Sequence, residues 1–494
     1  MALVSPINIA ALHQAGSSQT HALQMGSSKR YPDAWEKSEE PVIPGPGLFE
    51  NLPQGNQGPE ALPTPSECAV HLEMLEVFHA LRNEVIQSQD LDRSFNIKPK
   101  NKVVYRPKRE GARYVAEPLS LKDGTFERRR KAKWTYYLEL AVTRFHIWIA
   151  QIDMHLGESK SSSKQLPQLF LLPPLVKLDV LVVWHAFLLN CSDFKEYCNK
   201  RKLEHIQEIA FPWSEIHDAI DSRNWRYTLP ATHAQWLLTV GGIHPDLLDA
   251  IVRAELKSNV AKRLLTKFST SFFNRNNTNT LNFNHDNAGD RMAAFAGMVS
   301  TAAADQKENR PLVENVERQC VFVDKMHAHR WIRSPAVEGT MRRAVDRYDK
   351  FLHLFHLYPY RFLVPTLDID LVWHTHQCSA DHYRQFVTTR AGRFINHEDK
   401  ISRGTLDHGF TNTEDFYRLS FGEQYQVCLC WSCEAILSAV EEREEEDILD
   451  TTTPDVSDLA KSVDKKVHYY QEVEVCRRMG RRLPIWTQDA GTVM

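Results

Sequence analysis

Three cysteines close together are the residues of this chain whose type and spacing best suit a specific chemistry. Cys428, Cys430 and Cys433 stand in the run Cys-Leu-Cys-Trp-Ser-Cys. Thiolates bind zinc, and a closed structural zinc site takes four ligands, typically cysteine with histidine. A Cys-x-Cys step reaches one ion from an extended loop, and Cys430 and Cys433 suit the beginning of a helix over 434–443. The sequence therefore predicts a zinc site. The alternative is three cysteines that pack without a metal, as small apolar side chains do.

A second feature is the signature Leu-Asp-x-x-x-Val-Trp-His, which occurs at 178–185 and again at 367–374. Related pentapeptides precede the copies, at 141–145 and 344–348, and each copy also follows a proline. Because both order and spacing recur, we interpret the copies as an internal duplication of one helical unit. The matching residues are Asp179, Trp184 and His185 in the first copy, and Asp368, Trp373 and His374 in the second.

We interpret the first copy as scaffold. Tryptophan supplies buried area, and the aspartate suits the positive end of a helix. No other metal-binding residue type clusters around His185 in the sequence, so a core histidine is the expected role there.

The second copy adds polar residues where the first is apolar. Asp370 replaces an aliphatic residue, and His376 stands where the first copy has Phe187. On a helix Asp370 and His374 share a face, so the carboxylate can fix the tautomer of the imidazole. His374 and His376 point in roughly opposite directions on a helix, and they can share a metal only from an extended segment.

The fourth zinc ligand must come from outside the cysteine run. His374, His376 and His408 are the candidates, and we favour His376 because the first copy lacks both it and the cysteines. Asp368, Asp370, Trp373, His374 and His408 are then expected as supporting residues.

A metal-dependent enzyme is a second hypothesis. His397-Glu398-Asp399 and His244-Pro245-Asp246 both contain His-x-Asp, a fragment of the two-histidine, one-carboxylate site of iron oxygenases. This reading, as an oxygenase or a hydrolase, requires His397, Asp399 and His408 to lie close together. The chain has no Gly-x-Ser-x-Gly elbow, phosphate-binding loop or dinucleotide fingerprint, and we expect no catalytic residues.

A third hypothesis is an RNA-binding regulator, because residues 98–133 are rich in lysine and arginine. We favour a solvated loop followed by the exposed first turns of a helix, since Tyr105 and Tyr114 are the sparse aromatic residues there. The formal net charge of −3 provides no global basic field for nucleic acid.

Composition is that of a globular protein, with 494 residues, 42% of them hydrophobic and 25% charged. The nine cysteines are odd in number and scattered, so we expect a reducing compartment, the cytoplasm or also the nucleus. Charges and two prolines interrupt the most apolar stretch, 166–189, and the N-terminus lacks the pattern of a signal peptide. We therefore expect no membrane span.

Hydrophobic periodicity predicts a mainly α protein with two related helical lobes, and a strong helix is expected over 134–149. The expected organisation is a disordered tail over 1–66, a first lobe over 67–270, a flexible connector over 271–318, a second lobe over 319–440 and an acidic, amphipathic extension over 441–494.

Over roughly residues 130–440 the chain resembles the glycine-rich domain-containing protein-like family. The segments that carry the resemblance are 364–376, 394–400 and 428–433. The resemblance implies an intracellular, largely helical domain without a defined biochemical role. Plant members are linked to growth and stress responses, and some have a glycine-rich tail with an RNA-binding segment. This chain has 20 glycines and no glycine-rich tract.

Taken together, these features predict a helical scaffold or interaction protein with an unidentified protein partner and a structural zinc site in the second lobe.

Overall fold

The computed structural model describes residues 43–53, 61–161, 177–239, 244, 246–257, 263, 265–266, 268, 290–397, 403–446 and 456–484. These residues are mainly helical, which confirms the predicted mainly α character. One continuous cluster of buried apolar side chains runs from Cys68 to Val467, so the two halves of the chain share a core.

Helix α2 (Pro65–Gln87) lies at the centre of that core. Its first turn is a capping box, in which Glu67 N–H donates to Thr64 Oγ1 over 3.2 Å and Thr64 N–H donates to the Glu67 carboxylate over 2.8 Å. The helix packs against elements of both halves, and most of its length is buried. Because α2 is covered on several sides, its polar residues, such as His71, must find partners inside the protein.

The first half contains α3 (Gln89–Ser94), α4 (Phe126–Ser161), α5 (Leu178–Leu188), α6 (Cys191–Arg201), α7 (Trp213–Ala219), α8 (Ala231–Thr239) and α9 (Leu247–Lys257), with a small pair of strands, β3 (Ile220–Asp221) and β4 (Arg226–Tyr227). Helix α4 confirms the helix predicted over 134–149. Helix α5 carries the first signature, and all of its residues are buried.

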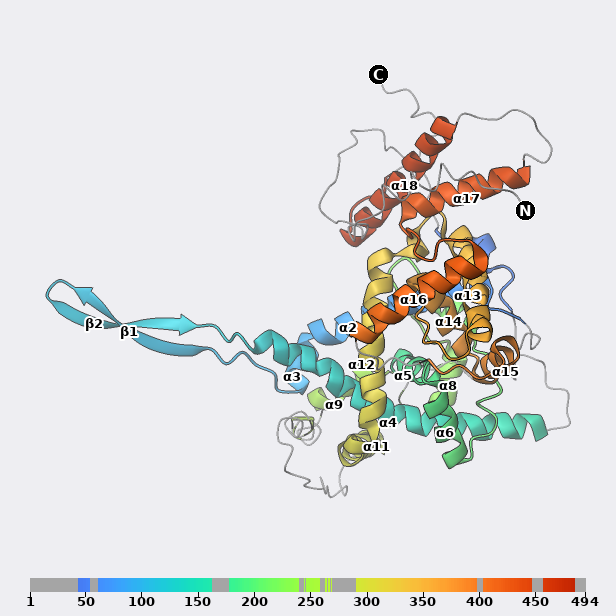
Figure 1. Cartoon of the computed structure of the whole chain (residues 1–494). Helices are drawn as coiled ribbons and strands as arrows, with labels where there is room; N and C mark the ends of the chain where they lie inside the picture. The colour runs from blue at the N-terminus through green and yellow to red at the C-terminus, as the bar shows by residue number, and fades with distance from the viewer. Residues whose placement is uncertain are drawn as a thin grey trace.

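The second half contains α11 (Asp290–Ala304), α12 (Gln306–His329), the short helix η3 (Trp331–Arg333), α13 (Val337–Leu357), α14 (Leu367–Gln377), α15 (Ala380–Ala391), α16 (Arg403–Phe421), α17 (Trp431–Glu446) and α18 (Val456–Arg478). Helix α14 carries the second signature. Helices α17 and α18 pack on each other at one end of the molecule (Figure 1).

Each signature helix is held by the same buried ion pair. The Nε of Arg144 in α4 donates to Asp179 Oδ2 over 2.6 Å, and the Nε of Arg347 in α13 donates to Asp368 Oδ2 over 2.6 Å. The arginines belong to the two related pentapeptides, and each aspartate lies in the first turn of its helix. The ion pairs give the two copies a common structural feature, while duplication itself remains a prediction.

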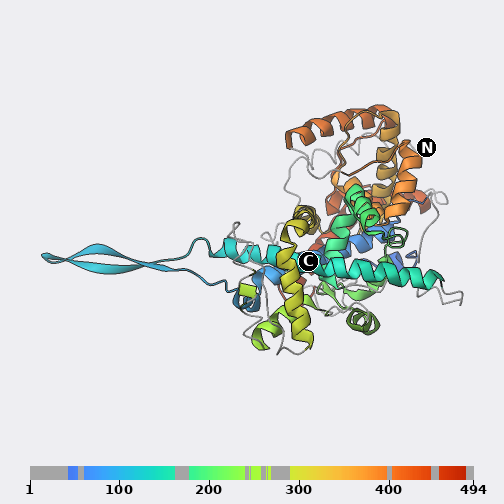
Figure 2. The same cartoon turned by 90° about the horizontal axis from the view of Figure 1, so that it is seen from below.

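Residues 102–121 differ from the solvated loop that the sequence favoured. They form an antiparallel hairpin of β1 (Lys102–Glu110) and β2 (Arg113–Leu121), which projects from the helical body (Figures 1 and 2). Every residue of both strands is exposed except Glu117, which is half-buried. The β-branched residues among the basic ones favour strand pairing here. The sequence interpretation favoured a loop because many of these residues are charged.

Part of the expected N-terminal tail is also folded. Residues 43–53 include the short helix η1 (Pro46–Phe49), whose Phe49 ring stacks on His217 with ring centroids 3.9 Å apart. Residues 61–66 are also described, and 65 and 66 begin α2, whereas 1–42 and 54–60 lie outside the described residues. The expected connector over 271–318 is helical from residue 290 onward, because α11 and most of α12 fall within it.

None of the helices in the described part of the chain combines the length and the apolar character needed to cross a bilayer.

Candidate metal centres

The three predicted cysteines come together at the start of α17. One sulfur from each of Cys428, Cys430 and Cys433 lies within 4.8 Å of the other two, so the group can hold a metal ion. Cys433 is buried and the others are half-buried. Hydrogen bonding to the Cys428 thiol raises the pKa of Cys430, with burial adding to the effect. Hydrogen bonding to Cys428 and Cys430 raises the pKa of Cys433, and burial adds to the effect. Both shifts favour the protonated thiols of Cys430 and Cys433 when no metal is bound.

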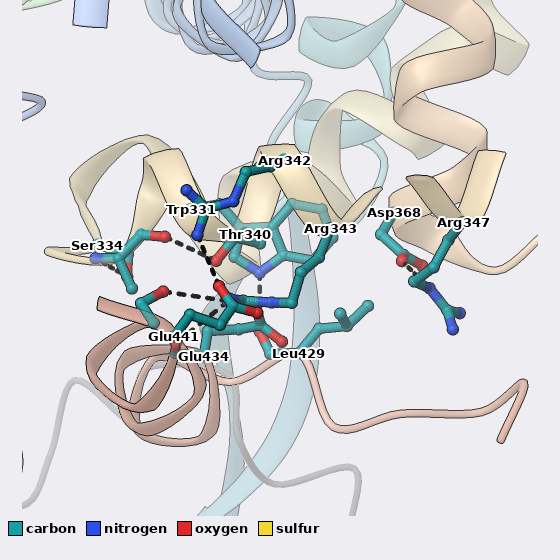
Figure 3. Close-up of polar contacts among 12 residues, drawn as sticks. Trp331, Ser334, Thr340, Arg342, Arg343, Arg347, Asp368, Leu429, Glu434 and Glu441 are labelled. Carbon is teal, nitrogen blue, oxygen red and sulfur yellow. Dashed lines mark hydrogen bonds and ion pairs between the residues drawn. The ribbon is translucent and has the colours of Figure 1, made fainter. Parts of the chain in front are cut away.

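Two tryptophans fasten the cysteine loop to the end of α12. The indole N–H of Trp331 donates to the Leu429 carbonyl over 2.9 Å, and the indole N–H of Trp431 donates to the His329 carbonyl over 2.9 Å. Figure 3 shows the first of these bonds. Because the two bonds run in opposite directions between the same two segments, they fix the loop in register with residues 329–331.

Arg343 joins α17 to α13. Its guanidinium donates to Glu434 Oε2 over 2.5 Å and to Glu441 Oε2 over 2.7 Å, as Figure 3 shows. Burial raises the pKa of Glu434, although the Arg343 charge opposes this shift. Since Glu434 follows Cys433 directly, the arginine also limits the movement of the cysteine group.

His376, the favoured fourth ligand, lies elsewhere. It is buried, its Nδ1 is 3.0 Å from the Tyr348 hydroxyl, and its ring meets those of Tyr383 and Phe386 edge to face. It is not among the atoms that gather within 4.8 Å around the cysteine sulfurs. His408 is exposed on α16 and joins neither metal-competent group found among the described residues. Because α14 is a helix, His376 and His374 point to different sides of it, and their imidazoles do not meet at one site.

A second metal-competent group consists of Asp370, His374 and His397. His374 Nε2 lies 3.2 Å from His397 Nε2, and Asp370 Oδ1 lies 3.2 Å from His397 Nε2 and 3.4 Å from His374 Nε2. Burial opposes ionisation of Asp370, but the two imidazoles outweigh it and hold the pKa of this carboxyl below its usual value. The predicted Asp370–His374 contact on one helix face is therefore present, and His397 joins it from the segment after α15.

Two further histidines lie near this group, and sequence reasoning missed their pairing. His71 Nε2 is 3.0 Å from His185 Nε2, and His71 Nδ1 is 2.8 Å from Thr375 Oγ1. Burial lowers the pKa of His185 to about 3, and it also lowers that of His71 well below its usual value. The pair is therefore neutral. No local signal could have found it, because the two residues lie 114 positions apart.

One difference between the two copies positions His397. The indole N–H of Trp373 donates to the Tyr383 hydroxyl over 2.7 Å, and that hydroxyl donates to the Ile395 carbonyl over 2.7 Å. Phe194 stands at the equivalent position in the first copy, and the buried Nε1 of Trp184 has no hydrogen-bond partner among the described residues. The hydroxyl thus ties the residues just before His397 to the second signature.

The two His-x-Asp fragments of the enzyme hypothesis differ in how much of them the structure describes. Asp399 lies outside the described residues, so its contact with His397 is not tested. In the other fragment, His244 Nδ1 lies 2.8 Å from the Asp246 carbonyl, and Asp246 Oδ1 accepts from Asp249 N–H over 3.0 Å. This second fragment forms the local entry to α9.

Comparison with known proteins places the similarity in the second half of the chain. The model of the family described as "Glycine-rich domain-containing protein-like" matches residues 267–385. Glycine-rich domain-containing protein 2 of Arabidopsis thaliana is 34% identical over 146 residues, which cover 26% of this chain and 18% of that protein. Glycine-rich domain-containing protein 1 of the same plant is 33% identical over 136 residues, which cover 25% of this chain and 16% of that protein.

The alignments thus span less than a fifth of the length of these relatives. No solved structure matches. The matched segment contains α14 with Asp370, His374 and His376, whereas the three cysteines lie beyond its end. The resemblance to the glycine-rich domain-containing protein-like family is thus confirmed, and residues 267–385 carry it.

Proposed function

We propose that this protein is a helical interaction protein whose second half is stabilised by a structural zinc ion bound to Cys428, Cys430 and Cys433. The observation that carries the proposal is the convergence of three sulfurs within 4.8 Å of one another. They lie on a loop that the indole hydrogen bonds of Trp331 and Trp431 hold in place. Three thiolates favour zinc over hard cations such as magnesium or calcium. A zinc ion would hold the cysteine loop and the start of α17 in one arrangement.

The fourth ligand that we propose is His329 in place of His376; its ring, like that of His376, is not among the atoms within 4.8 Å of the sulfurs, so it would have to turn towards them when the ion binds. His329 ends α12, and its carbonyl accepts the bond from Trp431, the residue after Cys430. Burial lowers the pKa of the His329 imidazole, although an ionised Cys428 would oppose this shift, and the neutral ring is the form that binds a metal. A cysteine-rich site completed by one histidine is a common structural zinc arrangement.

The hairpin β1–β2 is the surface that we propose for a protein partner. Three large side chains are exposed on this projecting arm: Val103 is 59% exposed, Tyr105 69% and Tyr114 73%. The strand register places all three on the same face of the ribbon. Large apolar side chains that stay exposed are typical of binding surfaces.

Metal analysis of the purified full-length protein tests the zinc site. We expect zinc to survive dialysis, and Cys430→Ser to release it and lower the melting temperature. Cys476→Ser is the matched control, because Cys476 is half-buried and lies outside the group. Absence of zinc, or equal effects of the two serine variants, would exclude the site. His329→Ala is expected to weaken zinc retention, and His376→Ala is expected to leave it unchanged.

Nucleic-acid binding is a second candidate function, and the same hairpin supports it. Arg109 pairs with Tyr114 in the strand register and shares the face that holds both tyrosines. A basic ribbon with exposed aromatic rings suits single-stranded RNA. Fluorescence anisotropy with a labelled RNA at low salt tests it, since binding through phosphate contacts must weaken as salt rises. If no binding is seen, or if Tyr105→Ala and Tyr114→Ala bind as well as the wild type, this candidate is excluded.

A further inference from the structure

Asp370, His374 and His397 form a triangle whose size matches three ligands of one metal ion. The Nε2 atoms of His374 and His397 are 3.2 Å apart. Asp370 Oδ1 lies 3.2 Å from His397 Nε2 and 3.4 Å from His374 Nε2. Ligand atoms at about 2.0–2.1 Å from a tetrahedral ion stand roughly 3.3 Å apart. The three atoms are therefore spaced as they would be around a bound ion.

Protons can place hydrogen bonds on two of the three edges when both imidazoles donate to the carboxylate. As a carboxylate, Asp370 has oxygens that act as acceptors only. Both imidazoles must then carry a proton on Nε2 to donate to it. In that case both N–H groups point at the carboxylate, and the 3.2 Å contact between His374 Nε2 and His397 Nε2 brings two donors together without a hydrogen bond. If either Nε2 is deprotonated instead, its lone pair faces the carboxylate. A cation in the triangle removes the conflict, since all three atoms then offer lone pairs to it.

The first copy of the signature provides an internal comparison. His185 stands at the position of His374, and it also meets a second histidine, His71, over 3.0 Å. Leu181 occupies the place of Asp370, so no carboxylate is present. Protons satisfy this pair completely. The Thr375 hydroxyl donates to the Leu371 carbonyl, His71 Nδ1–H donates to Thr375 Oγ1, and His71 Nε2 accepts from His185. The same scaffold therefore forms a histidine pair without a carboxylate in one copy and a triangle of two histidines and a carboxylate in the other.

We propose that Asp370, His374 and His397 form a binding site for a divalent transition metal ion, separate from the cysteine group and independent of it. Two imidazoles and one carboxylate suit zinc or iron(II), whereas calcium and magnesium prefer oxygen ligands throughout. The site borders solvent, because the Asp370 and His397 side chains are 22% and 13% exposed. Water or an exogenous ligand can therefore complete the coordination.

Tyr383 acts in this site as a positioning residue. Its hydroxyl links Trp373, beside His374, to the Ile395 carbonyl, two residues before His397. The His397 ring also packs edge to face on Trp373, with ring centroids 4.9 Å apart. These contacts hold His397 at the triangle without themselves reaching the metal position.

Cobalt(II) binding to the metal-free full-length protein tests the proposal and separates the two sites. Thiolate-bound cobalt has an intense sulfur-to-metal absorption in the near ultraviolet, which a site of two histidines and one aspartate lacks. We expect the wild type to bind two equivalents of cobalt, and Asp370→Leu or His397→Ala to lose one equivalent while keeping the thiolate band. Cys430→Ser is expected to lose the band and to keep the other equivalent.

His408→Ala is the control, because His408 is an exposed histidine outside both groups. Near-ultraviolet circular dichroism verifies that each variant is folded. Tyr383→Phe, which restores the residue type of the first copy, is expected to weaken cobalt binding at the histidine site about tenfold, as the loss of an orienting contact does. The proposal is overturned if folded Asp370→Leu and His397→Ala bind as much cobalt as the wild type, or if all bound cobalt shows the thiolate band.

Discussion

Arg347 Nε lies 2.6 Å from Asp368 Oδ2 and joins α13 to the first turn of α14 (Figure 3). The same guanidinium also donates to the Tyr425 carbonyl over 2.7 Å, and the Asp368 side chain is 1% exposed. The Arg347 guanidinium thus positions the helix that carries Asp370 and His374 through its ion pair with Asp368. Through its bond to Tyr425 it also holds the segment that precedes the cysteine loop.

Asp368→Asn should destabilise the protein strongly, because it leaves the Arg347 charge buried without its counter-charge. Breaking a buried pair from one side costs about 3–5 kcal/mol. Urea unfolding at neutral pH measures the change. Asp415→Asn is the matched control, because Asp415 pairs with Arg418 over 3.0 Å at an exposed position, where a pair contributes about 1 kcal/mol at most. Equal shifts for the two variants would contradict the importance of the buried pair.

Arg343→Gln should loosen α17 and the cysteine loop. The substitution removes charged hydrogen bonds to Glu434, which is 4% exposed, and to Glu441. Hydrogen bonds to charged groups contribute roughly 1.5–3 kcal/mol each. We expect faster amide exchange over 428–443 and weaker zinc retention. The neighbouring Arg342, which is 50% exposed and also contacts Glu441, provides the control variant Arg342→Gln. A similar response to both substitutions would argue against this role for Arg343.

Because of Glu139, the free energy of unfolding should fall as the pH rises. Burial raises the pKa of this α4 carboxyl to about 8, and Glu317 adds to the effect while Arg310 opposes it. The unfolded chain ionises near pH 4.5, so the contribution of the protonated group is complete below that pH. It is then lost as the pH rises through about 8.

Glu139→Gln should therefore be more stable than the wild type above pH 8, by on the order of 3 kcal/mol, and nearly equal to it at pH 4.5. Urea unfolding across that range measures the difference. Glu314→Gln, at a position 46% exposed, is the control and should show no such trend. A difference for Glu139→Gln that does not change with pH would contradict the assignment.

Removal of the hairpin arm should leave the fold intact. Both strands are exposed along their length, so replacing residues 103–120 with a short glycine-serine linker removes little buried surface. We expect the melting temperature to change by no more than about 2 °C. For comparison, Phe145→Ala in the core, at a fully buried position, should cost about 3–5 kcal/mol. A large loss of stability on removal of the hairpin would show that it packs against the body.

The sequence by itself determined the features that depend on local spacing. Periodic apolar residues predicted α4, the repeated signature predicted the buried helices α5 and α14, and three cysteines within six residues had to lie close together whatever the fold. The i, i+4 spacing of Asp370 and His374 also brought them to one helix face, since a helix turns once every 3.6 residues.

Only the tertiary structure decided which distant residues join these local groups. His397 reaches Asp370 across 27 positions, and His71 reaches His185 across 114. Helix geometry separated His376 from His374, and the packing of α12 brought the His329 carbonyl to Trp431 beside the cysteines. Such contacts depend on how the helices pack against one another. A sequence pattern does not specify that packing, because one pattern is compatible with several arrangements of the helices. The spacing of residues along one helix, in contrast, follows from its fixed rise and turn.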